Sequence, residues 1–189
     1  MKRLFAVCAA AMLLAGCADS SAAESGVTAI PETLTAEPEE GFDQAYADCL
    51  RDYFAAIGSA DYEAYKKTVY PPYLECYGKY LEGEGSSLEQ SFDSLCHRFD
   101  EDGYDSWRLT TLTVGDYYNP DIEGFFETYQ KWGFIDEAFI GTAKAEAQEM
   151  KHVQFSLYAL YKGDEQPVCV VRGSETLMLK TDSGVYVIG

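Results

Sequence analysis

The sequence predicts an α+β domain in which N-terminal helices pack on a curved antiparallel sheet. Two observations lead to this prediction. Between residues 42 and 99, apolar side chains recur at steps of three and four residues, which is the period of a helix with one buried face. From residue 153 onward, apolar and polar residues alternate and turn residues separate the alternating runs, as in an antiparallel meander. Helices first and paired strands last is the element order of an α+β fold.

The first two helices follow from their apolar stripes and their end signals. Apolar residues mark one face over residues 46–57, and Gly58 is placed to end this helix. A second, shorter helix is expected to begin at Asp61. It should end before Pro71 and Pro72, because the residue before a proline is driven out of the helical conformation.

A third helix is expected over residues 87–99. Its apolar face consists of Leu88, Phe92, Leu95 and Phe99. His97 lies off this face, so we expect its side chain to be solvated. The preceding segment, residues 73–85, is first aromatic and then rich in glycine, and it is left unassigned.

The middle of the chain predicts one strand and one more helix. Residues 107–114 are rich in Thr, Leu and Val, which favours a strand. Asn119 fits the N-cap of a helix that has Pro120 at its first position. The apolar stripe of this helix extends to Trp132.

The last part of the chain predicts the meander. In residues 153–161 the odd-numbered side chains are apolar, as a strand with one buried face requires. His152 belongs to the polar side of this alternation and is expected to be solvated. Further strands are expected at residues 167–172, 174–181 and 185–188.

Residues 1–16 have the properties of an export signal. Lys2 and Arg3 precede an apolar run, residues 4–14, that is too short to span a bilayer. The following Leu-Ala-Gly-Cys, residues 14–17, resembles the lipobox of bacterial lipoproteins, in which the cysteine is lipidated and becomes the new N-terminus. This resemblance implies a lipid on Cys17 that anchors the protein to the membrane, on the extracytoplasmic side of the cell envelope. The alternative is an ordinary signal peptide with a chance cysteine.

The signal is followed by two regions of different composition. Residues 17–40 are rich in Ser, Ala, Thr, Glu and Pro, which predicts the lipidated cysteine and a flexible acidic tether. The folded domain is expected over residues 41–189. The formal net charge of −18 disfavours nucleic acid, whose phosphates call for clustered Lys and Arg, and it is repelled by anionic lipid. The lipid on Cys17 is therefore the expected membrane contact.

The cysteines leave two alternatives open. Outside the signal and the lipobox, the chain has Cys49, Cys76, Cys96 and Cys169. In an exported protein they can form two disulfides, or they can stay reduced as small buried hydrophobic residues. No CxxC spacing occurs, so neither a thioredoxin-like site nor a zinc knuckle is expected.

Two segments resemble the NTF2-like (cystatin-like α+β cone) superfamily. Residues 52–65, DYFAAIGSADYEAY, are similar to its opening helix pair, and residues 153–188 are similar to its closing meander. The resemblance implies helices on a curved sheet with an apolar cavity between them. Members of the superfamily include isomerases, dehydratases and small cyclases, and also proteins that only bind a ligand or dimerise.

The resemblance implies one candidate catalytic pair. Tyr53 falls near the position where the ketosteroid-isomerase branch places a hydroxyl donor to an enolate, and Glu75 is the carboxylate nearest to the expected base position. That chemistry also needs a second, protonated acid in an apolar pocket. No such acid is found, so Tyr53 is more simply a core aromatic residue.

One segment has partial calcium-loop character. Asp100, Asp102 and Asp105 place oxygen ligands around a glycine, as calcium loops do. The later bidentate Glu is missing, because the corresponding position is Thr111. With two histidines and no cysteine at ligand spacing, no transition-metal site is expected either.

These observations favour a non-catalytic, membrane-anchored domain. We expect it to bind a protein partner from the envelope or a small apolar ligand through the concave side of the sheet. A homodimer is also compatible with the superfamily. No cofactor is implied, and the alternative is an enzyme of the isomerase or dehydratase type.

Overall fold

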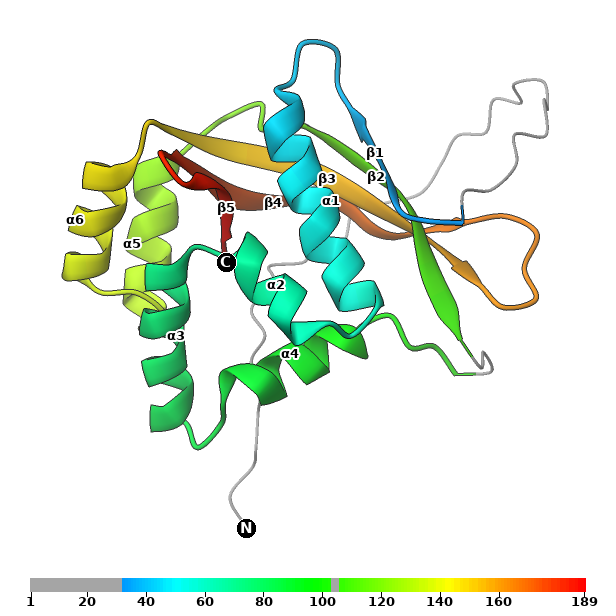
Figure 1. Cartoon of the computed structure of the whole chain (residues 1–189), viewed down its shortest axis with the longest axis horizontal. Coiled ribbons are helices and arrows are strands. Elements are labelled where there is room, and N and C mark those ends of the chain that lie inside the picture. Colours follow the sequence, from blue (N-terminus) through cyan, green and yellow to red (C-terminus); the bar gives the residue numbers. More distant parts are fainter. Residues whose placement is uncertain (1–31, 103–105) are drawn as a thin grey trace.

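The computed structural model describes residues 32–102 and 106–189 (Figure 1). The helices within these ranges are α1 (Gln44–Gly58), α2 (Tyr62–Thr68), α3 (Pro71–Gly83), α4 (Leu88–Cys96), α5 (Ile122–Trp132) and α6 (Glu137–Glu146). The strands are β1 (Thr35–Pro38), β2 (Trp107–Asp116), β3 (Glu149–Tyr161), β4 (Val168–Thr181) and β5 (Gly184–Ile188). This is an α+β fold, and the predicted fold class is confirmed. The sheet is open and has the strand order β1-β2-β3-β4-β5.

Strands β2 to β5 form an antiparallel meander, in which the two strands predicted at residues 167–172 and 174–181 are one continuous strand, β4, whereas β1 was not predicted. It pairs in parallel with β2, from Thr35 opposite Thr111 to Pro38 opposite Val114, so the sheet is mixed. These residues lie in the segment expected to be tether. The composition of residues 35–38 does not favour a strand. They form one because their backbone pairs with β2. Pro38, which lacks an N–H, is tolerated because β1 is an edge strand.

Two helices, α3 and α6, were also not predicted. Pro71 and Pro72 end α2 as expected, but they also open α3, because a proline fits the first turn of a helix, where its missing N–H is not needed. In α6 the fully buried side chains are Phe139 and Ala143, which is too few for a clear stripe. The carboxylate of Asp136 marks its start by accepting the N–H of Phe139 at 2.7 Å.

Helix α1 covers one face of the sheet (Figure 1). The ring of Phe54 lies on the ring of Phe155 from β3, with 5.1 Å between centroids. The odd-numbered residues of β3 that were predicted to be buried are buried: Val153, Phe155, Leu157, Ala159 and Tyr161. The periodicity of both elements therefore identified this layer of the core.

The opposite face of β3 is covered at one end by α5, and this corrects a prediction. His152 was expected to be solvated, but it is buried, because Phe125 of α5 packs against it with 6.1 Å between ring centroids. The N-cap of α5 is Asp121 rather than Asn119, and its carboxylate accepts the N–H of Gly124 at 2.8 Å. His97 is exposed, as predicted.

Candidate functional site

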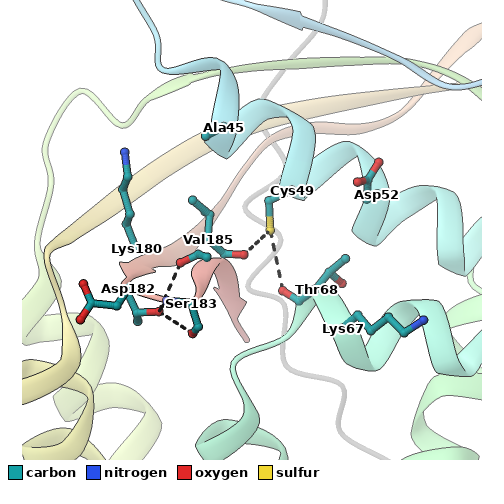
Figure 2. A pocket seen from close by; sticks show the side chains of 11 residues that line it. Ala45, Cys49, Asp52, Lys67, Thr68, Lys180, Asp182, Ser183 and Val185 are labelled. Atoms are coloured by element: carbon teal, nitrogen blue, oxygen red, sulfur yellow. Dashed lines mark hydrogen bonds between the residues drawn. The ribbon is translucent and has the colours of Figure 1, made fainter.

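An open hollow of about 560 Å³ lies between α1, the end of α2 and the turn that joins β4 to β5 (Figure 2). We call it the α1–β5 hollow. It is lined by Ala45, Cys49, Asp52, Lys67, Thr68 and residues 180–185. The contributing elements are far apart in the sequence, and they meet here because α1 lies beside β5 and an isolated bridge joins Val69, just after α2, to Val187.

The thiol of Cys49 forms the floor of the hollow. It donates to the carbonyl oxygen of Val185 at 3.2 Å and lies 3.8 Å from the carbonyl oxygen of Thr68 (Figure 2). Burial raises the pKa of Cys49 to about 12. The thiol therefore stays protonated at neutral pH and acts as a hydrogen-bond donor, since only the thiolate is a nucleophile.

The turn between β4 and β5 forms one wall of the hollow, and hydrogen bonds within the turn hold its shape. The hydroxyl of Thr181 accepts the N–H of Ser183 at 3.1 Å and lies 2.9 Å from the hydroxyl of Ser183. Gly184 has a φ of +149°, a backbone conformation that favours glycine. Asp182 accepts a hydrogen bond from the side-chain amide of Gln148, which ties the turn to the start of β3. The wall is thus held by local hydrogen bonds.

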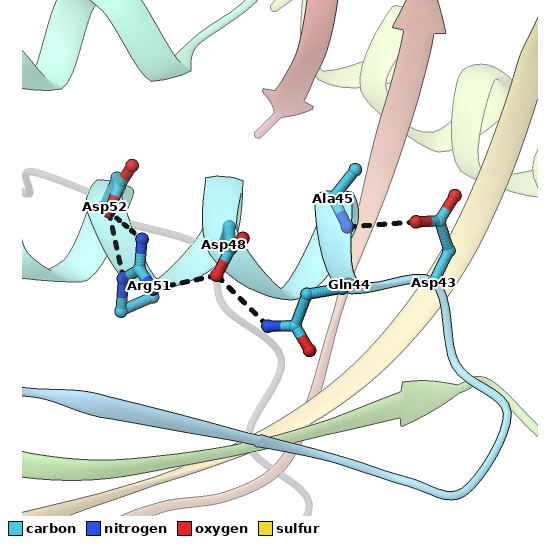
Figure 3. Close-up of polar contacts among 6 residues, drawn as sticks. All are labelled: Asp43, Gln44, Ala45, Asp48, Arg51 and Asp52. Carbon is cyan, nitrogen blue, oxygen red and sulfur yellow. Dashed lines mark hydrogen bonds and ion pairs between the residues drawn. The ribbon is translucent and has the colours of Figure 1, made fainter.

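Charged side chains of both signs stand around the rim. Lys180 Nζ lies 3.3 Å from Asp43 Oδ2, which links the sheet to the N-terminus of α1. The N–H of Ala45 and the nearby Lys180 lower the pKa of Asp43. Asp52 pairs with Arg51 at 2.8 Å on the exposed face of α1 (Figure 3). Lys67, at the end of α2, is exposed.

The rim of the hollow provides the ammonium groups of Lys67 and Lys180 and the carboxylates of Asp52 and Asp182. Among the residues that the structure describes, no three or more His, Cys, Asp or Glu side chains gather as metal ligands. The chemistry available here is charge pairing and hydrogen bonding with a ligand that lies across the hollow.

The structure does not bring the predicted catalytic pair together. Tyr53 is buried in the core, where its ring lies 5.0 Å from that of Phe54 and 5.3 Å from that of Tyr65. Glu75 is exposed on α3. Neither residue lines the α1–β5 hollow.

The calcium-loop candidate is only partly within the described residues. Asp100 Oδ1 accepts the indole N–H of Trp107 at 2.7 Å. This hydrogen bond links the residues that follow α4 to the first residue of β2. Asp102 is exposed, and Asp105 lies outside the described residues.

The cysteine candidates have separate places in the fold. Cys49, Cys76, Cys96 and Cys169 are all partly buried free thiols. Cys17 lies outside the described residues.

Comparison of the chain with protein-family models, with curated proteins and with solved structures gives no match. Within residues 32–102 and 106–189, no helix has the length and apolar character that crossing a bilayer requires.

Proposed function

We propose that the protein is an extracytoplasmic lipoprotein, anchored through a lipid on Cys17, with a non-catalytic NTF2-like domain. We propose further that this domain binds a partner protein, and that the α1–β5 hollow is the binding site. The proposal rests on the convergence of Asp52, Lys67, Lys180 and Asp182 around a hollow whose floor and wall are hydrogen-bonded.

The packing under α1 supports a protein partner over a small apolar ligand. A ligand cavity between α1 and the sheet would need free volume there. Instead, buried side chains fill this space, and the rings of Phe54 from α1 and Phe155 from β3 meet there with 5.1 Å between centroids. Binding at the surface is thus the better-supported mode.

The chemistry of the rim supports a polypeptide as the ligand. An extended segment carries both N–H and carbonyl groups along its length, and its side chains can match charges of both signs. Lys67 and Lys180 stand out on a chain with a formal net charge of −18, because they provide local attraction for an acidic side chain of the partner. Pairing with rim charges mainly sets orientation and the rate of encounter.

Site-specific photocross-linking tests the binding site. A photoreactive amino acid replaces Asp52 at the rim of the hollow or Glu75 on α3, in the full-length chain expressed in its own host. Both positions are exposed, so Glu75 is a matched control. We expect a protein adduct from position 52 in intact envelopes and little from position 75. Equal adducts from both positions, or none from position 52, would contradict the proposed site.

The anchor is tested separately. In the Cys17→Ser variant we expect loss of fatty-acid labelling and release of the chain from the membrane fraction. Retention of the label in this variant would contradict lipidation at Cys17 and leave the binding proposal untouched.

A further inference from the structure

His152 joins three elements of the fold through its backbone and its side chain. It lies on β3, and 5 % of its side chain is exposed. Its backbone carbonyl accepts the N–H of Tyr117, directly after β2, at 2.9 Å. Its Nδ1 accepts the backbone N–H of Asp121, the N-cap of α5, at 3.2 Å. The residue thus fixes both ends of the connection between β2 and α5, residues 117–121.

These contacts define the tautomer of the neutral ring. A nitrogen that accepts an N–H cannot carry a proton itself, so the proton lies on Nε2. Nε2 is buried and 3.3 Å from Glu175 Oε2, without the alignment of a hydrogen bond. The lone pair that a second proton would use is therefore the one that holds Asp121.

We propose that His152 is an acid-sensitive latch: its neutral ring holds the connection of residues 117–121 to the sheet, and its protonation releases this connection. When Nδ1 gains a proton, it becomes a donor that faces the backbone N–H of Asp121, and the hydrogen bond between them is lost. A buried donor without a partner is costly, so the N-cap of α5 must move away or leave its N–H unpaired. This inference is independent of the proposed partner binding.

The groups around the ring favour such a response. From β4, the carboxylate of Glu175 attracts the charged ring. From the connection, Tyr117 packs on the ring with 4.6 Å between centroids. A hydrogen bond with Tyr118, followed by burial and the charge of Glu175, raises the pKa of Tyr117 to about 12, so its phenol stays neutral while histidine titrates.

The remaining neighbours carry charges that are already engaged. Asp121 uses its carboxylate to cap α5, where it accepts the N–H of Gly124. Asp116, at the end of β2, pairs with Lys151 on β3 at 3.1 Å. From α5 itself, the apolar ring of Phe125 faces His152. Glu175 is therefore the charge that acts most directly on the ring.

The latch controls an exposed aromatic segment. Tyr118, which is 81 % exposed, lies in the connection next to Tyr117. Release of Asp121 frees this segment from one of its two attachments to β3. A change in proton concentration outside the cytoplasmic membrane would thus alter how the tyrosine pair is presented.

Nuclear magnetic resonance of the full-length chain tests the latch. Long-range ¹H–¹⁵N spectra at pH 8 should show the Nε2–H tautomer of His152. Between about pH 8 and about pH 5 we expect the hydrogen-exchange protection of the Asp121 amide to fall at least about tenfold. This protection is corrected for the intrinsic exchange rate, and the amide of Leu50 in α1 should keep its own protection.

Two variants distinguish a latch that responds to protonation of His152 from a purely structural role of this residue. His152→Asn keeps an acceptor near the Nδ1 position but cannot be protonated, so the protection of Asp121 should no longer depend on pH. Glu175→Gln removes the negative charge beside Nε2 from a half-exposed side chain, so release of the connection should require a lower pH. An Nδ1–H tautomer at pH 8, or unchanged Asp121 protection while the wild-type ring titrates, would overturn the proposal.

Discussion

The two sides of α1 differ in how they are filled. Beneath the helix, Phe54 contacts Phe155 and Tyr53, and the interior is occupied by rings. Beside the helix, the α1–β5 hollow stays open, with Lys180 and Asp52 at its rim. Helix α1 thus has one apolar face that is packed against the sheet. Another side of the same helix forms a wall of the charged α1–β5 hollow.

This difference separates stability from recognition. Apolar area removed from water stabilises the fold, and changes beneath α1 should be felt throughout the molecule. Exposed charges add little to stability, so changes at the rim should act on binding.

Phe54→Ala should have the largest effect. Removing this buried ring leaves a cavity against Phe155, and such changes cost about 3–5 kcal/mol. Urea unfolding of the variant measures the loss. Tyr118→Ala, at an exposed position, is the control and should stay within about 0.5 kcal/mol of the wild type. Equal losses of unfolding free energy in the two variants would contradict the conclusion that packing beneath α1 stabilises the fold.

Cys49 should make stability depend on alkaline pH. Burial raises the pKa of this thiol from its ordinary value of 9.0 to about 12. Between these values the unfolded chain has lost the proton and the folded chain has kept it, so the stabilisation is complete below pH 9 and is lost as pH rises. The slope should reach about 1.4 kcal/mol per pH unit.

Cys49→Ser is the matched variant for this measurement, because serine keeps a donor toward Val185 and does not titrate. The difference in free energy of unfolding between wild type and variant should shrink from about pH 9 to pH 10, before unfolded tyrosines begin to dominate. A difference that is constant over this range would show that the thiol is not buried as described.

Lys180→Gln should have the smallest effect on stability. Its ammonium group pairs with Asp43, and both side chains are more than a third exposed, so the loss should be about 0–1 kcal/mol. Partner binding should weaken and become less sensitive to salt. Titration of the partner at two salt concentrations measures both. Unchanged binding would remove Lys180 from the site.

The sequence predicted the packing between α1 and β3, but it gave no indication of the α1–β5 hollow. The stripe of α1 and the alternation of β3 each depend on neighbouring residues, so their period is visible in the sequence. The α1–β5 hollow joins Cys49, Thr68 and Val185, which are brought together only by tertiary packing. No local pattern could have indicated it.

His152 shows where a correct period gives a wrong prediction. It does lie on the polar side of β3, as the alternation indicated. The other face of the strand is not solvated at this end, because α5 covers it. The aromatic stripe of the helix that precedes β3 in the chain is the signal that could have indicated a cover for this histidine.

Native mass spectrometry of the full-length chain, released from the envelope of its own host in mild detergent, tests whether a protein binds at the α1–β5 hollow. We expect the mass of the chain together with a second polypeptide, and loss of that polypeptide when Lys67 and Lys180 are both changed to Glu. A complex that contains only a small apolar molecule, unaffected by these changes, would contradict binding of a protein at the α1–β5 hollow.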